Sequence, residues 1–325
     1  MSTTIGAEGW TELFAATLEN RETDPVDQIF TRHPTLDLFR QYAKPASGRE
    51  LVLYLEGAED DNTVVTDKSG TFDLEFAPDL LGTAVYQWSS PYVSRVRLPW
   101  QDLQENRGKE QLVALLEFHM ENVQKSHAKK IALGLHKAVP ASGEFLSLNK
   151  IVSDTTTVGG IDPAEKDYWA STVLNISAVE TDPTYQPIRK AFRTMRNELN
   201  VNNKSGQNVT HIIAGRKVFE EFEDAFDDKV RYLISQDRDG QTRFAAYMDG
   251  DIEVRLDPDC PEDRAYFLDV TTWRFMHLND NFMKVHPSQV ITGTFDIVTP
   301  VASVLCLATN QRRANGVLIR DYDGS

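Results

Sequence analysis

The chain has 325 residues, 41% of them hydrophobic and 10% aromatic, a composition that supports a buried core and excludes a disordered chain. Its 49 acidic residues outnumber 34 basic ones and give a formal net charge of -15. Such a surface repels phosphate, and the densest basic spots, Lys129-Lys130 and Arg312-Arg313, hold only two residues each. We therefore expect no basic patch for nucleic acid.

The sequence predicts neither a membrane-spanning helix nor a secretory signal peptide. No apolar run approaches the roughly 20 residues that a membrane-spanning helix needs. The opening segment MSTTIGAEGW lacks the basic and apolar regions of a signal peptide. The two cysteines, Cys260 and Cys306, are too few for a disulfide framework. We expect a reducing compartment and no membrane association.

The N-terminal part of the chain predicts an arm followed by a hairpin. Residues 1–45 contain one short amphipathic stretch and several Pro-containing turns, with little core of their own. From Gly48 the pattern alternates with period two, and after an acidic, turn-rich stretch at 57–70 a second alternation follows. The apolar positions of the two runs are Leu51, Leu53 and Leu55, then Phe72, Leu74 and Phe76. A two-stranded ribbon alone is marginally stable, so this one lies on its own domain or on a neighbouring subunit.

The clearest predicted helix runs from about 106 to about 130. Its stripe falls at spacings of three and four and consists of Leu112, Leu115, Leu116, His119, Met120, Val123 and His127. A rise of ~1.5 Å per residue makes this helix roughly 35 Å long. It predicts a structural strut in which the histidines are held by hydrogen bonds.

The second half predicts a compact α/β subdomain and a closing set of strands. Residues 140–180 are rich in loops, and Gly159-Gly160 predicts unusual backbone angles there. A helix at about 185–199, a strand at 209–214 and a further apolar-striped helix follow through residue 226. Strands dominate 267–318, and the run from Val301 to Ala308 predicts a strand buried on both faces. The fold class is α+β.

Motifs of catalysis do not assemble in this sequence. It lacks an HExxH helix, a GxxxxGK[ST] loop and a GxSxG elbow. His277, Asp280 and His286 could form a metal set, which leaves a metal-dependent hydrolase as an alternative. Asp-Gly pairs at 239–240 and 249–250 favour hairpin turns over calcium loops. Arg312-Arg313 could contact phosphate or, next to an apolar strand, act as a surface or subunit salt-bridge donor. We expect no enzyme and no cofactor.

Several short segments together resemble tailed-bacteriophage major capsid proteins. Residues 87–98, 106–110 and 112–116 resemble the end of that family's extended loop and the start of its spine helix. Further segments follow in the family's order: Val158-Gly-Gly-Ile161 with Tyr168-Trp169, Ile188 to Leu199, Val209 to Phe226, Tyr266 to Asp269 with Trp273, Val285-His-Pro287, and Leu305 to Leu318. The resemblance covers about residues 46–318.

The resemblance implies the Hong Kong 97 type of fold. Its expected parts are an N-terminal arm (1–45), an extended hairpin loop (46–98), a peripheral domain with the spine helix (99–180), an axial domain (181–265) and a return to the peripheral sheet (266–325). The apolar residues of the hairpin would contact a neighbouring subunit, and Leu112, Leu116, Met120 and Val123 would form the core of the spine helix. Lys68 lies in the loop, but no motif identifies a cross-linking partner.

The resemblance also implies a function. Copies of the chain would assemble as hexamers and pentamers into an icosahedral shell that encloses double-stranded DNA without sequence-specific binding. Portal, scaffolding and decoration proteins would be partners, the location would be the virion, and assembly would take place in the host cytoplasm. An encapsulin-like nanocompartment shell and a phage tail or connector protein remain alternatives.

Overall fold

A computed structural model describes residues 32–55, 82–99, 109–176, 187–202, 208–225, 247–249, 252–279, 281–290 and 296–320. The chain forms two compact units. Unit 1 comprises Met1–Arg49, Gln87–Ser147 and Phe275–Leu307, and unit 2 comprises Glu50–Tyr86, Leu148–Arg274 and Ala308–Ser325. These units cut across the expected segments 99–180 and 266–325, because strands distant in the sequence pair with one another.

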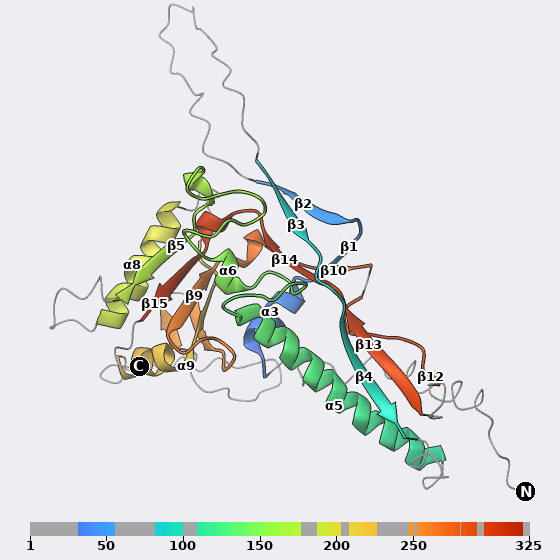
Figure 1. The fold of residues 1–325 in the computed structure, drawn as a ribbon. Coiled ribbons are helices and arrows are strands. Elements are labelled where there is room, and N and C mark those ends of the chain that lie inside the picture. The colour runs from blue at the N-terminus through green and yellow to red at the C-terminus, as the bar shows by residue number, and fades with distance from the viewer. Residues whose placement is uncertain are drawn as a thin grey trace, which may run out of the picture. The chain divides into compact units, whose positions relative to one another are not determined.

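Unit 1 is built on a long helix and a small antiparallel sheet. Strand β4 (Tyr92–Leu98) pairs with β13 (Ile297–Ser303) along all seven residues, with Leu98 opposite Ile297. The short strands β11 (Lys284–Val285) and β12 (Gln289–Val290) also pair with β13. Figure 1 shows helix α5 (Lys109–His136) running beside β4 and β13. The predicted hairpin loop therefore ends too late at residue 98, since β4 belongs to this sheet.

The expected arm is partly an element of unit 1. Residues 34–41 form helix α3 (Pro34–Gln41), whose Leu36 and Phe39 side chains are fully buried. Phe39 packs on Phe275, with 6.3 Å between ring centroids. Strand β1 (Lys44–Ala46) then pairs in parallel with β10 (Trp273–Leu278), which is followed in the same sheet by β14 (Leu305–Thr309). The prediction of an arm through residue 45 with little core was wrong for this part, and residues 1–31 lie outside the described ones.

Unit 2 is a six-stranded mixed sheet covered by two helices. The strand order is β5-β15-β9-β6-β8-β7. The strands are β5 (Thr172–Asn175), β15 (Gly316–Ile319), β9 (Arg264–Leu268), β6 (His211–Ala214), β8 (Ile252–Leu256) and β7 (Tyr247–Asp249). Asp249 pairs with Ile252, which confirms a hairpin at this Asp-Gly site. The α/β pattern predicted for 185–260 is confirmed in its element types.

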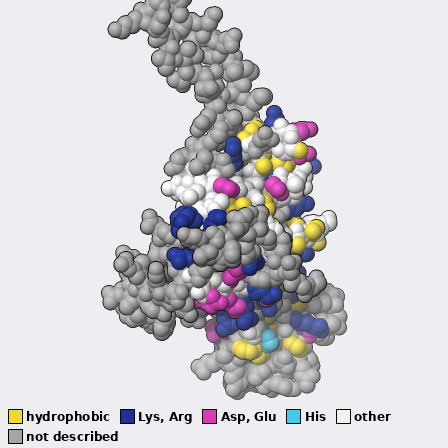
Figure 2. All heavy atoms as spheres, turned by 90° about the vertical axis from the view of Figure 1, so that its left-hand side faces the viewer, with side chains coloured by type: hydrophobic (Ala, Val, Ile, Leu, Met, Phe, Trp, Pro, Cys, Tyr) yellow, Lys and Arg dark blue, Asp and Glu magenta, His cyan; other side chains and the backbone are white. Residues whose placement is uncertain are grey.

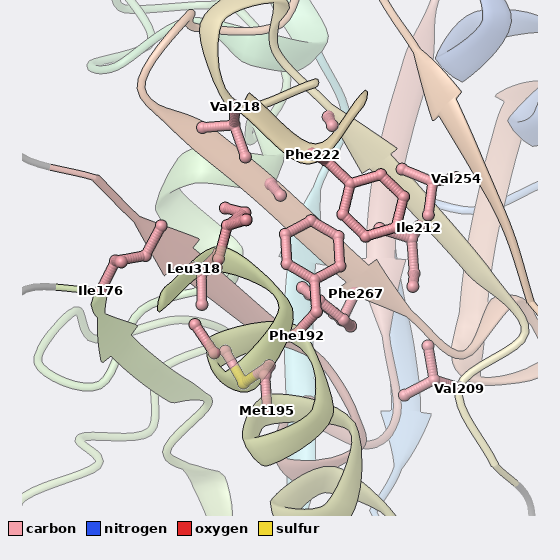
Figure 3. Packing of buried hydrophobic residues seen from close by; sticks show 14 of the residues in the cluster. Ile176, Phe192, Met195, Val209, Ile212, Val218, Phe222, Val254, Phe267 and Leu318 are labelled. Carbon is pink, nitrogen blue, oxygen red and sulfur yellow. The ribbon is translucent and has the colours of Figure 1, made fainter. Parts of the chain in front are cut away.

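One apolar core holds these helices to the sheet. Helix α8 (Pro187–Asn202) and helix α9 (Arg216–Asp224) send buried side chains into the same cluster, as Figure 3 shows. Phe192 stacks on Phe222 at a centroid distance of 4.6 Å and meets Phe267 of the sheet edge-on at 5.2 Å. Helical spacing puts Ile188, Phe192, Met195 and Leu199 on one side of α8, and the opposite side is left to solvent.

The remaining elements are short. They are β2 (Glu50–Tyr54), β3 (Thr83–Gln87), α6 (Leu148–Ile151) and the 3₁₀ turns η1 (Asp167–Trp169), η2 (Val270–Thr272) and η3 (Arg312–Ala314). Every residue of β14 is buried. The prediction of one strand buried on both faces from Val301 to Ala308 holds only for its β14 part, because residues 301–303 belong to β13, where burial alternates. None of the helices in the described ranges is long and apolar enough to cross a membrane.

Candidate assembly surfaces

The hairpin predicted from the alternating pattern begins as a two-stranded ribbon of β2 and β3. The two strands pair with each other, and Leu55 N–H donates to the carbonyl of Gly82. Phe72, Leu74, Phe76 and the rest of 56–81 lie outside the described residues. Leu51 and Leu53 are half-buried and Leu55 is 1% exposed within its own chain. Leu55 was predicted to contact a neighbouring subunit, and that prediction was wrong.

The side of the ribbon opposite Leu51, Leu53 and Leu55 is the side exposed to solvent. On β2, Val52 is 51% exposed and Tyr54 is 75% exposed, and on β3 Val85 is 39% exposed. We refer to these three side chains as the outward face. The opposite side of β3 is anchored: Ala84 is fully buried and the Tyr86 hydroxyl donates to the Thr309 carbonyl at 2.8 Å. Both strands carry apolar residues on both sides, so alternation alone could not show which side the unit would cover.

A glycine loop fixes the inner side of the ribbon. Gly159 and Gly160 have φ of +63° and +82°, which confirms the prediction of unusual backbone angles. Val85 N–H donates to the Gly159 carbonyl at 3.0 Å. A Cβ atom added at Gly159 would lie 2.7 Å from the Ala84 Cβ, closer than two non-bonded carbon atoms normally approach. The bare backbone at this glycine therefore lets the loop lie directly against β3.

Replacing Gly159 with alanine is expected to lower the free energy of unfolding by about 2–3 kcal/mol, through left-handed backbone strain and the clash with Ala84. Gly160→Ala is the matched control. Its φ is also positive, but a Cβ there meets nothing within 4 Å, so we expect only the strain, about 1 kcal/mol. Urea denaturation of both variants measures the difference, and equal losses would show that the contact with Ala84 does not matter.

Arg312 lies inside unit 2, where the sequence predicted a surface or subunit salt-bridge donor. Its side chain is fully buried, and the guanidinium donates to the carbonyls of Ile151 (2.7 Å), Ser153 (2.6 Å) and Thr156 (3.0 Å). The cation also lies over the Trp169 ring at 5.7 Å. Burial lowers the pKa of Arg312 to about 10, which leaves it charged at neutral pH. The prediction was wrong because the N–H groups of the guanidinium donate to backbone carbonyls of residues 151–156 and so hold this loop in place.

Asn315 is a second buried polar residue of unit 2, and the sequence analysis did not single it out. The Asn315 side chain accepts from the Asp269 backbone N–H (2.9 Å) and from Trp273 Nε1–H (2.7 Å). Its amide donates to Thr272 Oγ1 (3.0 Å) and to the Gln311 carbonyl (2.9 Å). All the hydrogen-bonding capacity of the amide is thus used. No motif marks such a residue, since its partners come together only in the folded chain.

Helix α5 carries the predicted stripe against the sheet of unit 1. Leu116 and Met120 are buried with Val96, Leu98, Ile297 and Val301, and Val123 packs against that cluster. The side chain of Leu112 lies outside the described ones. The helix continues to His136, beyond the predicted end near 130, because Ile131 and Leu135 extend the buried stripe by nearly two turns.

His127 joins this helix to both strands beneath it. Its Nδ1 lies 2.8 Å from Ser94 Oγ on β4, and its Nε2 lies 2.8 Å from Ser303 Oγ on β13. The residue is 2% exposed, and burial lowers its pKa to about 4. The hydrogen-bonded structural role predicted for this histidine is confirmed.

The metal set considered from the sequence finds no support in the described part of the chain. His277 is buried with its ring near Phe282, and His286 donates its backbone N–H to Pro300. Asp280 is outside the described residues. Within those residues, no three His, Cys, Asp or Glu side chains lie close enough to hold a metal ion. Cys260 and Cys306 are both buried thiols, and burial raises the pKa of Cys306 to about 12.

Helix α8 carries a cluster of positive charge that the sequence analysis missed. Arg189, Lys190 and Arg193 are exposed and Arg196 is half-buried, all on the side of α8 away from the core. We refer to these four as the basic face. Figure 2 shows the side of the molecule on which α8 lies, and Lys and Arg side chains gather there. The expectation that no basic patch exists was wrong, because helical spacing collects cations that are separated in the sequence.

Comparison with known proteins gives a match by fold alone. No family model and no curated protein matches the sequence. The cyanophage A-1(L) capsid matches with 14% identity and a TM-score of 0.61, covering 88% of this chain and 92% of that one. The capsid of the native GTA particle matches with 10% identity and a TM-score of 0.60, covering 88% and 90%. The SrpI encapsulin of Synechococcus elongatus matches with 12% identity and a TM-score of 0.55, covering 94% of each chain.

The chain therefore has the mixed helix and strand fold of capsid-shell proteins. The phage and GTA neighbours are structural components of capsids. At these identities the likeness concerns the fold, and the α+β class predicted from the sequence agrees with it.

Proposed function

We propose that this chain is the major capsid protein of a tailed bacteriophage, with the Hong Kong 97 type of domain arrangement. Copies assemble as hexamers and pentamers into an icosahedral shell around double-stranded DNA. The fold likeness, which extends over most of this chain and of each capsid chain it matches, supports a shell-forming role. Helix α5 serves as the spine of the peripheral domain, and the sheet with α8 and α9 forms the axial domain.

The observation that carries this proposal is the outward face of the ribbon. Val52 and Tyr54 are large apolar side chains held in the open by strands whose other side is anchored on unit 2. Burying such a side chain stabilises a contact by roughly 1.5–3 kcal/mol before association costs. A neighbouring subunit that covers the outward face would supply that burial. The subunit thus completes its apolar contacts by association with further copies.

The other proposed partners follow from the same role. A portal, scaffolding proteins and decoration proteins would act with this chain, the finished location would be the virion, and assembly would occur in the host cytoplasm. The role is structural and not catalytic.

A second candidate is an encapsulin-like nanocompartment shell, which the fold likeness to the SrpI encapsulin favours. Shells made by the two classes differ in what they enclose. Shells purified from the native source would contain nuclease-protected duplex DNA under the phage proposal and protein cargo under the alternative. Negative-stain microscopy of the expressed chain tests both, since a stable monomer at high concentration contradicts either one.

Tyr54→Asp is expected to prevent shell formation while leaving the subunit folded, because it places a charge where a neighbour would bury an aromatic ring. Sedimentation and microscopy read the assembly, and circular dichroism reads the fold. Leu256→Asp is the matched control, since Leu256 is also an exposed apolar residue of unit 2, at 40%, but lies outside the ribbon. Normal shells from Tyr54→Asp would contradict the proposed role of the outward face.

A further inference from the structure

Helix α8 bears an unusual charge distribution for a chain of net charge -15. Its first three turns contain Arg189, Lys190, Arg193 and Arg196, and its one carboxylate, Glu198, comes only after them. No ion pair involving Lys190 or Arg193 is present among the described residues. Lys190 and Arg193 are exposed to solvent, and no carboxylate lies between the four cationic positions in the sequence of the helix.

The cations of the basic face are also aligned. At 3.6 residues per turn, Arg189, Arg193 and Arg196 fall within about 60° of one another around the helix axis, with Lys190 at the edge of the same side. The first and last of the three arginines are about 10 Å apart along the axis. Phosphates of one strand of a duplex follow each other at about 3.4 Å of axial rise, so this row matches a run of successive phosphates in length.

The position of the basic face is rigid. Phe192 and Met195 lie between the cationic positions in sequence and are fully buried in the core of unit 2. Figure 3 shows both side chains pointing from α8 toward Phe267 and Leu318 of the sheet. Because these residues fix the rotation of the helix, the cations cannot turn inward. A surface fixed in this way keeps its charge facing solvent.

A second copy of the chain is the alternative occupant of the basic face, since the chain carries a net charge of -15. On α9, Glu220 pairs with Arg216 at 2.8 Å and Glu221 with Arg320 at 3.2 Å, and the same helix also carries Glu223 and Asp224. These carboxylates are few and lie on one short helix. Duplex DNA instead offers a continuous row of phosphates, with one charge per ≈ 1.7 Å of axis, that a straight row of cations can follow.

We propose that the basic face of α8 is a sequence-independent binding site for the phosphate backbone of duplex DNA. This inference deepens the proposed function, because it gives the enclosed duplex a defined contact on the shell protein. Contacts to phosphate alone carry no sequence information, so the site accepts any duplex. Releasing counterions from about four phosphates makes the affinity strongly dependent on salt.

The test uses the full chain below the concentration at which light scattering detects shells, so that every surface is open to the probe. Fluorescence anisotropy with a labelled random-sequence duplex of about 30 base pairs gives the affinity between about 50 and 200 mM salt. We expect log K to fall against log salt with a slope of about -3 to -4. Lys190→Gln with Arg193→Gln should make the slope shallower by about 2 and weaken binding at least tenfold.

The matched control is Lys129→Gln with Lys130→Gln, which removes the same number of exposed cations from α5 and should leave the binding unchanged. Equal weakening by both variants would mean a response to net charge and would overturn the proposal. Absence of duplex binding by the unaltered chain would also overturn it. A Lys190/Arg193 variant that fails to form shells but still binds duplex would overturn it as well, and would assign the basic face to a contact with a second copy. Microscopy of the same preparations separates the two claims, since shells without duplex binding contradict only this inference, and binding without shells contradicts only the proposed function.

Discussion

Replacing Arg312 with leucine is expected to lower the free energy of unfolding by about 3–5 kcal/mol, one of the largest effects of any single substitution in this chain. The leucine fills much of the space, but it leaves the carbonyls of Ile151, Ser153 and Thr156 without the donors that now satisfy them. Buried carbonyls that lose a partner cost free energy of their own. Chemical denaturation measures the loss.

Two further variants separate the shape of the guanidinium from its charge. Arg312→Lys keeps the charge but offers one compact ammonium in place of a planar fork, so we expect it to recover only part of the stability. Arg313→Leu is the neighbouring control: Arg313 is half-buried and makes none of the three carbonyl contacts, so its loss should be much smaller. A loss below about 1 kcal/mol for Arg312→Leu would contradict the assignment of Arg312 as an internal tie.

Arg312→Leu should also destabilise the ribbon of β2 and β3. The loop held by Arg312 leads into Gly159, whose carbonyl accepts from Val85 N–H on β3. Hydrogen exchange at the Val85 amide should therefore quicken in Arg312→Leu more than exchange in β6 or β9. Uniform quickening across unit 2 would mean that Arg312 contributes only to global stability.

Hydrophobic periodicity predicted which segments form helices and strands better than it predicted which face of each element is buried. The stripe of α5 and the apolar side of α8 were readable because apolar residues recur at three and four positions, even though α5 also exposes Phe118 and Leu133. The ribbon was different. Leu51, Leu53 and Leu55 alternate with Val52 and Tyr54, so both sides are apolar, and only the folded unit shows which side it covers.

The roles of residues whose hydrogen-bond partners meet only in the folded chain could not be predicted from the sequence. Arg312 stands beside a second arginine in a polar turn, a context that is ordinarily solvated, and its acceptors lie more than 150 positions away. Asn315 has the same character. The basic face could have been found, because the positions of α8 left over after assigning Ile188, Phe192 and Met195 to the core are those that hold its cations.

The unit boundaries were also not readable. Strand β4 pairs with β13 about 200 residues later, and β15 inserts between β5 and β9. Alternation indicates a strand, but it does not name the partner of that strand. The resemblance to capsid proteins supplied an order of segments, and the contacts of the folded chain supplied the units.

The stability of unit 1 is expected to fall by about 3 kcal/mol through His127 alone as the pH drops from 7 to below 4. The buried imidazole has a pKa of about 4 in the folded chain, against 6.5 as its ordinary value. Between these two values the unfolded chain binds a proton that the folded chain does not. Stability is therefore fully present above pH 6.5, declines through the window, and loses nothing more from this group below pH 4.

The contacts of His127 explain why protonation is unfavourable. The neutral ring is matched by two hydroxyls, Ser94 Oγ and Ser303 Oγ, and the latter also accepts the Met283 backbone N–H at 2.8 Å. This arrangement favours the tautomer in which Nδ1 carries the proton and Nε2 accepts from Ser303. Burial is the cause of the lowered pKa, since charging the ring there removes its hydration.

His127→Gln isolates the contribution of the ring, because glutamine keeps a donor and an acceptor but does not titrate. Carboxylates titrate in both proteins, so the quantity to measure is the difference between the two unfolding free energies at each pH. The wild type should be the more stable protein at pH 7, and its advantage should shrink by about 3 kcal/mol by pH 4. Parallel curves for the two proteins would show that His127 does not resist protonation, and that the junction of α5 with β4 and β13 tolerates a charged ring.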